Sequence, residues 1–150
     1  MDLFRDALNQ QEINMDQKIH GGCLCGAVRF SVEGPFDRFH LCYCSRCRKI
    51  TGSAHASNIF TAADRITWLS GEDKISRYEL PDAERFFKTF CSLCGSAVPG
   101  ISKNGQTLLI PAGSLEEDPR IRPMSSIFWK DRATWYEEGL SARRFDGYPS

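Results

Sequence analysis

The sequence predicts a mainly β fold that is held together by bound metal and contains only short helical turns. From Gly21 onward, short segments rich in aromatic and β-branched residues are separated by Gly, Pro, Asn and Asp, which is typical of strands joined by turns. All seven cysteines lie in three tight clusters. Thiolates spaced two or three residues apart can turn onto one ion, so the clusters indicate metal as part of the framework.

The strand pattern is clearest at residues 27–33, where Val28, Phe30 and Val32 alternate with polar residues and share one face. The other expected strands are residues 39–42, 55–60, 66–69, 75–80, 85–90, 96–101, 107–111 and 125–129. Helix is expected only as brief turns at residues 45–50 and 61–64. Asn104 and Gly105 lie between two of the expected strands and predict a hairpin turn.

The chain has 150 residues, which fits a single domain with a sizeable core. Residues 1–18 form an amino-terminal extension before a domain at residues 19–150. In the extension, Leu3, Phe4, Ala7 and Leu8 recur at near-helical spacing, so a short amphipathic helix is one interpretation and a frayed terminus is the other.

The overall charge excludes some classes of partner. The chain has 19 basic and 19 acidic residues, so no basic excess favours nucleic-acid binding. The first 20 residues contain no apolar run long enough for a signal peptide, and no stretch of 18 apolar residues occurs. We therefore expect no membrane span and a cytoplasmic, reducing location, while exposed strand edges would permit a homodimer.

The cysteines allow three interpretations. A disulfide framework would leave one of seven thiols unpaired, and disulfides are rare in a reducing compartment. An iron–sulfur cluster is compatible with cysteine ligands, but the ferredoxin spacings are missing. Zinc fits best, and seven ligands divide into a closed site of four and a site of three with an open position. Closed sites usually build structure, whereas open ones can bind water or substrate.

The motifs resemble those of the glutathione-dependent formaldehyde-activating enzyme family (GFA), which includes a domain of centromere protein V. The matching segments are residues 22–30 (GCLCGAVRF), 42–49 (CYCSRCRK), 51–53 (TGS), 90–96 (FCSLCGS), 112–115 (AGSL) and 127–129 (IFW). The resemblance extends from about Gly21 to Gly147 and includes all three cysteine clusters in order.

This resemblance implies a β-tent type of zinc fold for the GFA-like domain, with two zinc ions per chain. It assigns a structural zinc to Cys23, Cys25, Cys91 and Cys94, and a catalytic zinc to Cys42, Cys44 and Cys47. The implied activity is that of a carbon–sulfur lyase that joins glutathione to formaldehyde, or to a related small electrophile, as S-hydroxymethylglutathione. Glutathione or its adduct and a small aldehyde are then the expected partners. The alternative is a non-catalytic, zinc-stabilised module that binds glutathione or another partner.

Further candidates surround the second cluster. Tyr43 occupies a position that is often histidine in the family, and it either relays protons weakly or only packs. His55 could move a proton in the reaction. The remaining candidates are substrate-binding residues, with the cations suited to glutathione carboxylates and the hydroxyls suited to a developing oxyanion: Arg46, Arg48, Lys49, Thr51 and Ser53.

Overall fold

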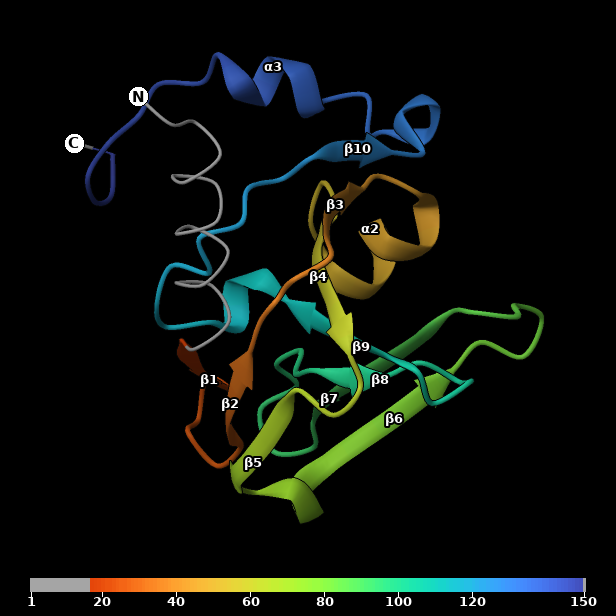
Figure 1. Ribbon diagram of the computed structural model, residues 1–150. Helices are drawn as coiled ribbons and strands as arrows, with labels where there is room; N and C mark the ends of the chain where they lie inside the picture. Colours follow the sequence, from red (N-terminus) through yellow and green to blue (C-terminus); the bar gives the residue numbers. More distant parts are fainter. Residues whose placement is uncertain (1–16, 150) are drawn as a thin grey trace, which may run out of the picture.

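The computed structural model describes residues 17–149 and contains three β-sheets (Figure 1). The first sheet has the order β1-β2-β5 and is antiparallel. Its strands are β1 (Lys18–Gly22), β2 (Arg29–Glu33) and β5 (Ile66–Ser70). The second sheet has the order β10-β3-β4-β9-β8, and its strands are β3 (Arg38–Cys42), β4 (Ala56–Ala62), β8 (Gly100–Ile101), β9 (Thr107–Pro111) and β10 (Ser125–Ile127). Only the pair β10–β3 is parallel.

The third sheet is the antiparallel hairpin of β6 (Ile75–Glu79) and β7 (Phe87–Cys91). In Figure 1 this hairpin lies on the opposite side of the second sheet from β10. Lys103, in the β8–β9 turn, donates a hydrogen bond of 2.8 Å from Nζ to the Ala83 carbonyl oxygen. The loop of the hairpin is therefore tied to the second sheet.

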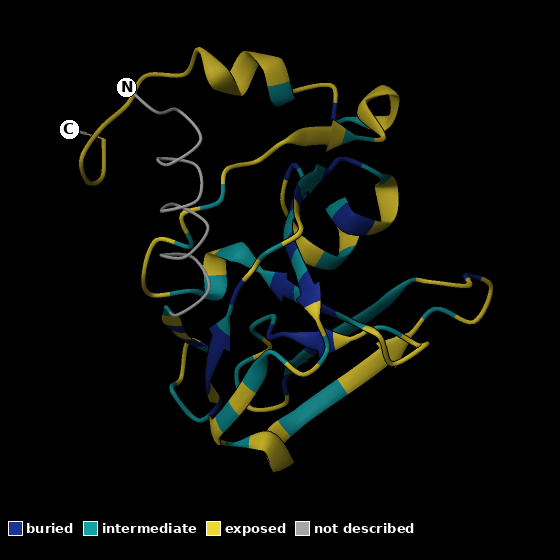
Figure 2. Ribbon diagram, in the orientation of Figure 1, coloured by how far each residue is buried: buried dark blue, intermediate teal, exposed yellow. Residues whose placement is uncertain are grey.

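The main hydrophobic core lies between the first two sheets. Phe30 and Val32 of β2 pack there with Ile59 of β4 and Ile110 of β9, and all four are fully buried. Figure 2 shows buried segments in β2, β4 and β9, whereas β6 consists of intermediate and exposed residues. Removing this apolar surface from water is the main source of stability.

Two α-helices and three 3₁₀ turns complete the described chain. The helices are α2 (Ser45–Thr51) and α3 (Tyr136–Leu140), and the 3₁₀ turns are η1 (Glu72–Lys74), η2 (Ala112–Ser114) and η3 (Trp129–Asp131). Helix α2 begins at Cys44, whose Sγ accepts a hydrogen bond from the Cys47 amide. It ends at Gly52, which has a φ of 63°, a conformation that glycine adopts without strain.

The mainly β architecture with short helices is confirmed, and so is the hairpin at Asn104 and Gly105. The predicted helical turn at residues 61–64 is wrong, because β4 continues to Ala62, which pairs with Thr107. The strand predicted at residues 96–101 is reduced to β8. The strand predicted at residues 125–129 ends at Ile127 and is followed by η3.

The structure adds two elements that the pattern did not indicate. Strand β1 precedes the first predicted strand and contains two glycines, which weaken a strand signal. Helix α3 has only five residues, too few for a helical period to be recognised. The helix predicted in the amino-terminal extension falls mainly on residues 1–16, outside the described part of the chain, and stays a prediction.

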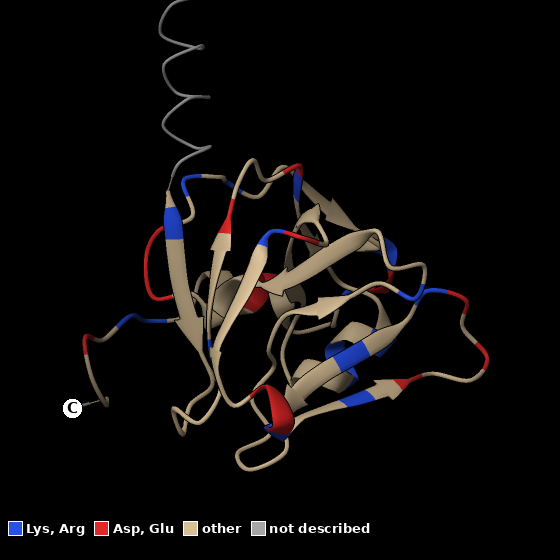
Figure 3. Cartoon of the chain, turned by 60° about the horizontal axis from the view of Figure 1, so that its bottom comes forward, with Lys and Arg blue, Asp and Glu red and all other residues tan. Residues whose placement is uncertain are grey.

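Charged residues of both signs alternate over the surface, as Figure 3 shows. The nine ion pairs among the described residues are at least partly exposed, and such pairs contribute little to stability. None of the described helices has the length and apolar character needed to cross a bilayer.

Candidate metal centres and the adjoining cavity

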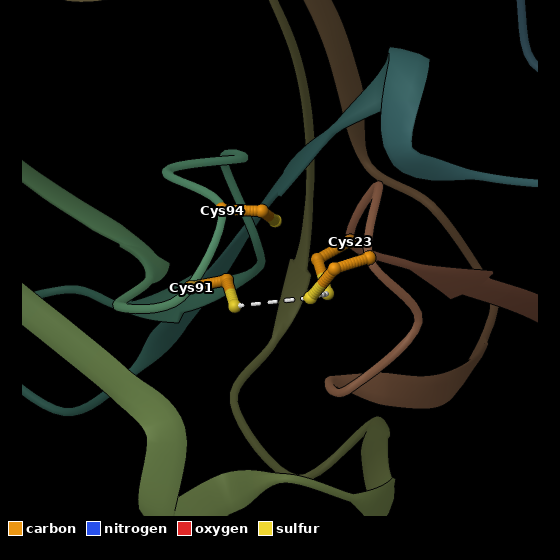
Figure 4. Close-up of side chains that lie close together, drawn as sticks. Cys23, Cys91 and Cys94 are labelled. Atoms are coloured by element: carbon orange, nitrogen blue, oxygen red, sulfur yellow. Dashed lines mark hydrogen bonds between the residues drawn. The ribbon is translucent and has the colours of Figure 1, made fainter.

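Four cysteines from distant parts of the chain meet at the edge of the first sheet. Cys23 and Cys25 lie in the turn between β1 and β2, Cys91 is the last residue of β7, and Cys94 lies in the turn that follows. Their sulfur atoms all lie within 4.8 Å of one another, and Figure 4 shows Cys23, Cys91 and Cys94 pointing to a common centre. We call this group the four-cysteine site.

Glycine turns form both halves of the four-cysteine site. The Gly26 amide donates to the Cys23 carbonyl oxygen at 3.1 Å, and the Gly95 amide donates to the Cys91 carbonyl oxygen at 2.8 Å. Both glycines have positive φ, 80° and 76°, so a side chain at either position would be strained. These tight turns direct two sulfurs of each half to the same side.

The spacing of the sulfurs fits a tetrahedral metal ion. Cys25 Sγ lies 3.5 Å from Cys23 Sγ and 3.9 Å from Cys91 Sγ. Four sulfurs about 2.3 Å from a tetrahedral zinc ion would lie about 3.8 Å apart. The seven cysteines are free thiols in the structure, so the disulfide interpretation is not supported.

The surroundings shift the pKa values of Cys94 and Cys25 in opposite directions. The side-chain hydrogen bond of Cys94 with Ser96, assisted by the amides of Cys25 and Ser96, lowers the pKa of Cys94 to about 5. The Ala27 amide favours the Cys25 thiolate, but the neighbouring thiols outweigh it and raise the pKa of Cys25 to about 11. Metal binding at this site therefore releases protons, because the ligands bind as thiolates.

The second group consists of Cys42, Cys44 and Cys47, whose sulfur atoms also lie within 4.8 Å of one another. We call it the three-cysteine site. Cys42 ends β3, Cys44 caps α2, and Cys47 lies in the first turn of that helix. Across residues 17–149 no fourth Cys, His, Asp or Glu joins the group. Burial raises the pKa of Cys47, so a bound cation is needed to hold its thiolate at neutral pH.

An aromatic cluster packs beside the three-cysteine site. Tyr43 is almost completely buried, and its ring centroid lies 4.9–5.0 Å from the rings of His55, Trp129 and Tyr136. Its hydroxyl donates to the Tyr136 hydroxyl at 2.8 Å. Burial and then this hydrogen bond raise the pKa of Tyr43. The Tyr43 side chain is therefore packed in the interior and does not face solvent.

A cavity of about 270 Å³ adjoins the three-cysteine site at Cys47. It lies between α2, the start of β4, the β6–β7 hairpin and the end of β9. Its apolar wall includes Phe86, Phe87, Val98 and Leu109. A small aldehyde would fill only a fraction of this volume, since one water molecule occupies about 30 Å³. The cavity can therefore hold part of a larger ligand.

Four ionisable side chains line the cavity: Cys47, His55, Arg85 and Lys88. His55 Nδ1 lies 3.2 Å from Ser57 Oγ. Lys88 Nζ donates to the Ile50 carbonyl oxygen at 2.9 Å, and burial lowers the pKa of Lys88. The lining contains no Asp or Glu, so Arg85 and Lys88 face no carboxylate there, and the Cys47 thiolate is the acidic group among the lining residues.

The structure separates the candidates that the sequence grouped together. Thr51 and His55 line the cavity with Cys47. The other proposed substrate-binding residues are not part of its lining: Arg46, Arg48, Lys49 and Ser53. Arg46 and Lys49 are exposed on α2. The Nε atom of Arg48 is buried without a hydrogen-bond partner among the described residues.

Sequence reasoning missed Lys88 and Arg85 as cavity residues and Tyr136 as the partner of Tyr43. Lys88 is 41 positions from Cys47 in the sequence, and Tyr136 is 93 positions from Tyr43. No local motif surrounds either residue. Only the pairing of β6 with β7 and the position of α3 bring them to the site.

Comparisons with known proteins agree with these motifs. The family model for the glutathione-dependent formaldehyde-activating enzyme matches residues 18–131. The chain belongs to this family. A relative from Halomonas elongata, named "Putative glutathione-dependent formaldehyde-activating enzyme", is 33% identical over 143 residues, covering 87% of this chain and 88% of the relative.

The part of the chain that matches the GFA family contains both cysteine sites, Tyr43 and His55, but ends before α3 and Tyr136. The fold also resembles the crystal structure of a Rhodobacter sphaeroides protein, with a TM-score of 0.56 and 22% identity. That similarity covers 71% of this chain and 98% of the other. The family thus accounts for the metal sites, whereas the contact of α3 with Tyr43 lies beyond the matched residues.

Proposed function

We propose that this GFA-family protein is a zinc-dependent carbon–sulfur lyase that adds the thiol of glutathione to formaldehyde or a related small electrophile. The observation that carries the proposal is the three-cysteine site, with three converging thiols and no fourth protein ligand across residues 17–149, next to a cavity. The family name and that of the Halomonas relative indicate the same reactants.

The two cysteine sites have different roles in this proposal. Cys23, Cys25, Cys91 and Cys94 hold a structural zinc ion, because four thiols close the coordination shell. Cys42, Cys44 and Cys47 hold a second zinc ion and leave one position open. Zinc at the open site would lower the pKa of a thiol that binds it. The protein is proposed to work in the cytoplasm, where such thiols stay reduced.

The chain's own residues orient the reactants. A carbon–sulfur bond forms between the thiol sulfur and the carbonyl carbon, the π electrons move to oxygen, and that oxygen takes up the proton lost by the thiol. His55 lines the cavity, and its Nδ1 lies near Ser57 Oγ, so Nε2 is the ring atom available to carry this proton. The Thr51 hydroxyl already donates to the Cys47 carbonyl oxygen at 2.7 Å, which fixes the last turn of α2.

The apolar wall of the cavity limits the number of water molecules around the carbonyl carbon. Addition of the thiol is therefore favoured over addition of water to the same carbon. Tyr43 is proposed to position Cys42 and Cys44 rather than to transfer protons, since its hydroxyl is already paired with Tyr136.

The test measures how fast free formaldehyde and glutathione interconvert with their adduct, S-hydroxymethylglutathione. The rate is obtained by two-dimensional exchange NMR in the presence of the purified, zinc-loaded protein. We expect a rate above the spontaneous one, about two zinc ions per chain, and loss of the extra rate in Cys47→Ser. Arg144→Gln, at an exposed residue outside the cavity lining, is the control and should keep the rate. A rate equal to the spontaneous one would contradict the lyase and favour a non-catalytic zinc-stabilised module.

A further inference from the structure

Lys88 is a half-buried cation whose hydrogen-bond partner is a neutral atom, and the Cys47 thiolate is a negative charge that acts on it without a hydrogen bond. Its Nζ donates to the Ile50 carbonyl oxygen, and no acidic side chain pairs with it across residues 17–149. A lysine ammonium has three N–H donors. Two donors therefore remain for a ligand on the side of the cavity that Lys88 lines.

The surroundings make this arrangement costly without an anion. The wall beside Lys88 is formed by Phe86, Phe87 and Val98, and the cavity lining contains no carboxylate. Burying a charge in such a place is unfavourable unless it is paired. The second cation of the lining, Arg85, is exposed and has the same sign. The cavity is thus suited to a negatively charged ligand.

The position of Lys88 relative to the metal ligands defines which kind of anion fits. Lys88 on β7 and Cys47 on α2 line one continuous cavity of about 270 Å³. A ligand in this cavity can approach both residues at once. A molecule with a thiol at one end and a carboxylate at the other can place its sulfur near Cys47 and its carboxylate near Lys88. A neutral or cationic thiol has no group that pairs with Lys88.

We propose that Lys88, with Arg85 as an outer cation, is a carboxylate-binding subsite that makes the protein specific for carboxylate-bearing thiols and their adducts. This inference rests on the proposed function in that it places the sulfur of the ligand at the three-cysteine site. It adds the group that selects the thiol, which the cysteine motifs alone do not indicate.

The experiment measures binding of S-methylglutathione and of its dimethyl ester to the zinc-loaded protein by calorimetry. The two ligands differ in their carboxylates, and neither has a free thiol that could add to an aldehyde. The wild type is expected to bind the acid about 10- to 100-fold more tightly than the ester, as for a hydrogen bond to a charged group. Lys88→Gln, which keeps a donor for the Ile50 carbonyl, is expected to lose this preference, and Lys88→Arg to retain most of it.

Arg144→Gln is the control, because it removes one exposed positive charge without altering the cavity lining. It should bind both ligands as the wild type does. Circular dichroism and the zinc content of each variant establish that it is folded and loaded. Equal affinity of the wild type for acid and ester, no binding of either, or an unchanged preference in Lys88→Gln would overturn the inference. Acid-selective binding through Lys88 without any acceleration of the exchange would overturn the proposed lyase and leave the subsite intact.

Discussion

The Tyr43 hydroxyl donates a hydrogen bond of 2.8 Å to the Tyr136 hydroxyl, across 93 positions of the chain. Tyr43 lies between two ligands of the three-cysteine site, and Tyr136 begins α3. The Tyr43 amide also donates to the Ile127 carbonyl oxygen at 3.0 Å. The carboxyl-terminal part of the chain therefore holds the loop that positions Cys42 and Cys44.

This pair should be coupled in its effect on stability. Tyr136→Phe leaves the buried Tyr43 hydroxyl without its acceptor, so we expect a loss of about 1 kcal/mol in the free energy of unfolding. Tyr43→Phe should cost about as much, and the double variant should cost clearly less than the sum. Urea unfolding of the zinc-loaded protein measures all three. Tyr148→Phe, at a side chain that is 97% exposed, is the control, and strictly additive losses would contradict the coupling.

The two cysteine sites should respond differently to loss of one ligand. Cys91 is fully buried in a site that joins segments 66 residues apart, so Cys91→Ser should lower the free energy of unfolding by more than about 3 kcal/mol. Cys44→Ser should keep the fold, because serine is also a good residue to cap α2.

Metal analysis and thermal unfolding provide the measurement for both variants. Each should fall from two zinc ions to one, but only Cys91→Ser should show a large drop in melting temperature. Equal destabilisation by the two substitutions would show that the sites are not divided into a structural one and an open one.

Gly71 should be far less tolerant of a side chain than Gly52. Both have positive φ, 73° and 63°. A Cβ at Gly71 would overlap the backbone of Ala27 and Val28, whereas a Cβ at Gly52 would meet nothing within 4 Å. We expect Gly52→Ala to cost about 1 kcal/mol from backbone strain alone, and Gly71→Ala to cost at least about twice that amount. Similar melting temperatures for the two variants would contradict the expectation that a Cβ at Gly71 clashes with the backbone of Ala27.

The hydrogen bonds of Glu117 with the amide and ring of His20 make a small part of the stability depend on pH. They hold the pKa of Glu117 below its usual value of 4.5. Because the pKa is lower in the folded state, the stabilisation is fully present above about 4.5 and is lost as the pH falls through the folded value. The carboxylate is about half exposed, which limits the effect to below about 1 kcal/mol.

Urea unfolding of Glu117→Gln between pH 3 and 6 tests this linkage. The difference in the free energy of unfolding from the wild type should shrink as the pH falls across that range. Glu138→Gln, on α3, serves as a charge-matched control. A difference for Glu117→Gln that stays constant with pH would show that the carboxylate has no linkage to folding.

The sequence predicted the clusters of cysteines and most of the strands because both are local patterns. The spacing of Cys23 with Cys25, and of Cys91 with Cys94, lies within single turns, and Phe30 and Val32 of the alternating segment lie on one strand, β2. The prediction was wrong where pairing with another strand determines the backbone conformation, as in the helical turn predicted at residues 61–64. Ala62 is extended because it pairs with Thr107 on β9, which no local propensity indicates.

The lining of the cavity could not be predicted in the same way. The cations next to Cys47 in the sequence, Arg46 and Lys49, are exposed on α2, whereas Lys88 reaches the cavity from β7. A helix directs neighbouring residues to different faces, so proximity in sequence to a ligand does not place a side chain beside it. The spacing of the cysteines by itself predicted three clusters of candidate ligands, and the resemblance to the family joined the first cluster to the third. The packing of α2 against the β6–β7 hairpin, and of α3 against Tyr43, decided what surrounds the open site, because those contacts join residues far apart in the chain.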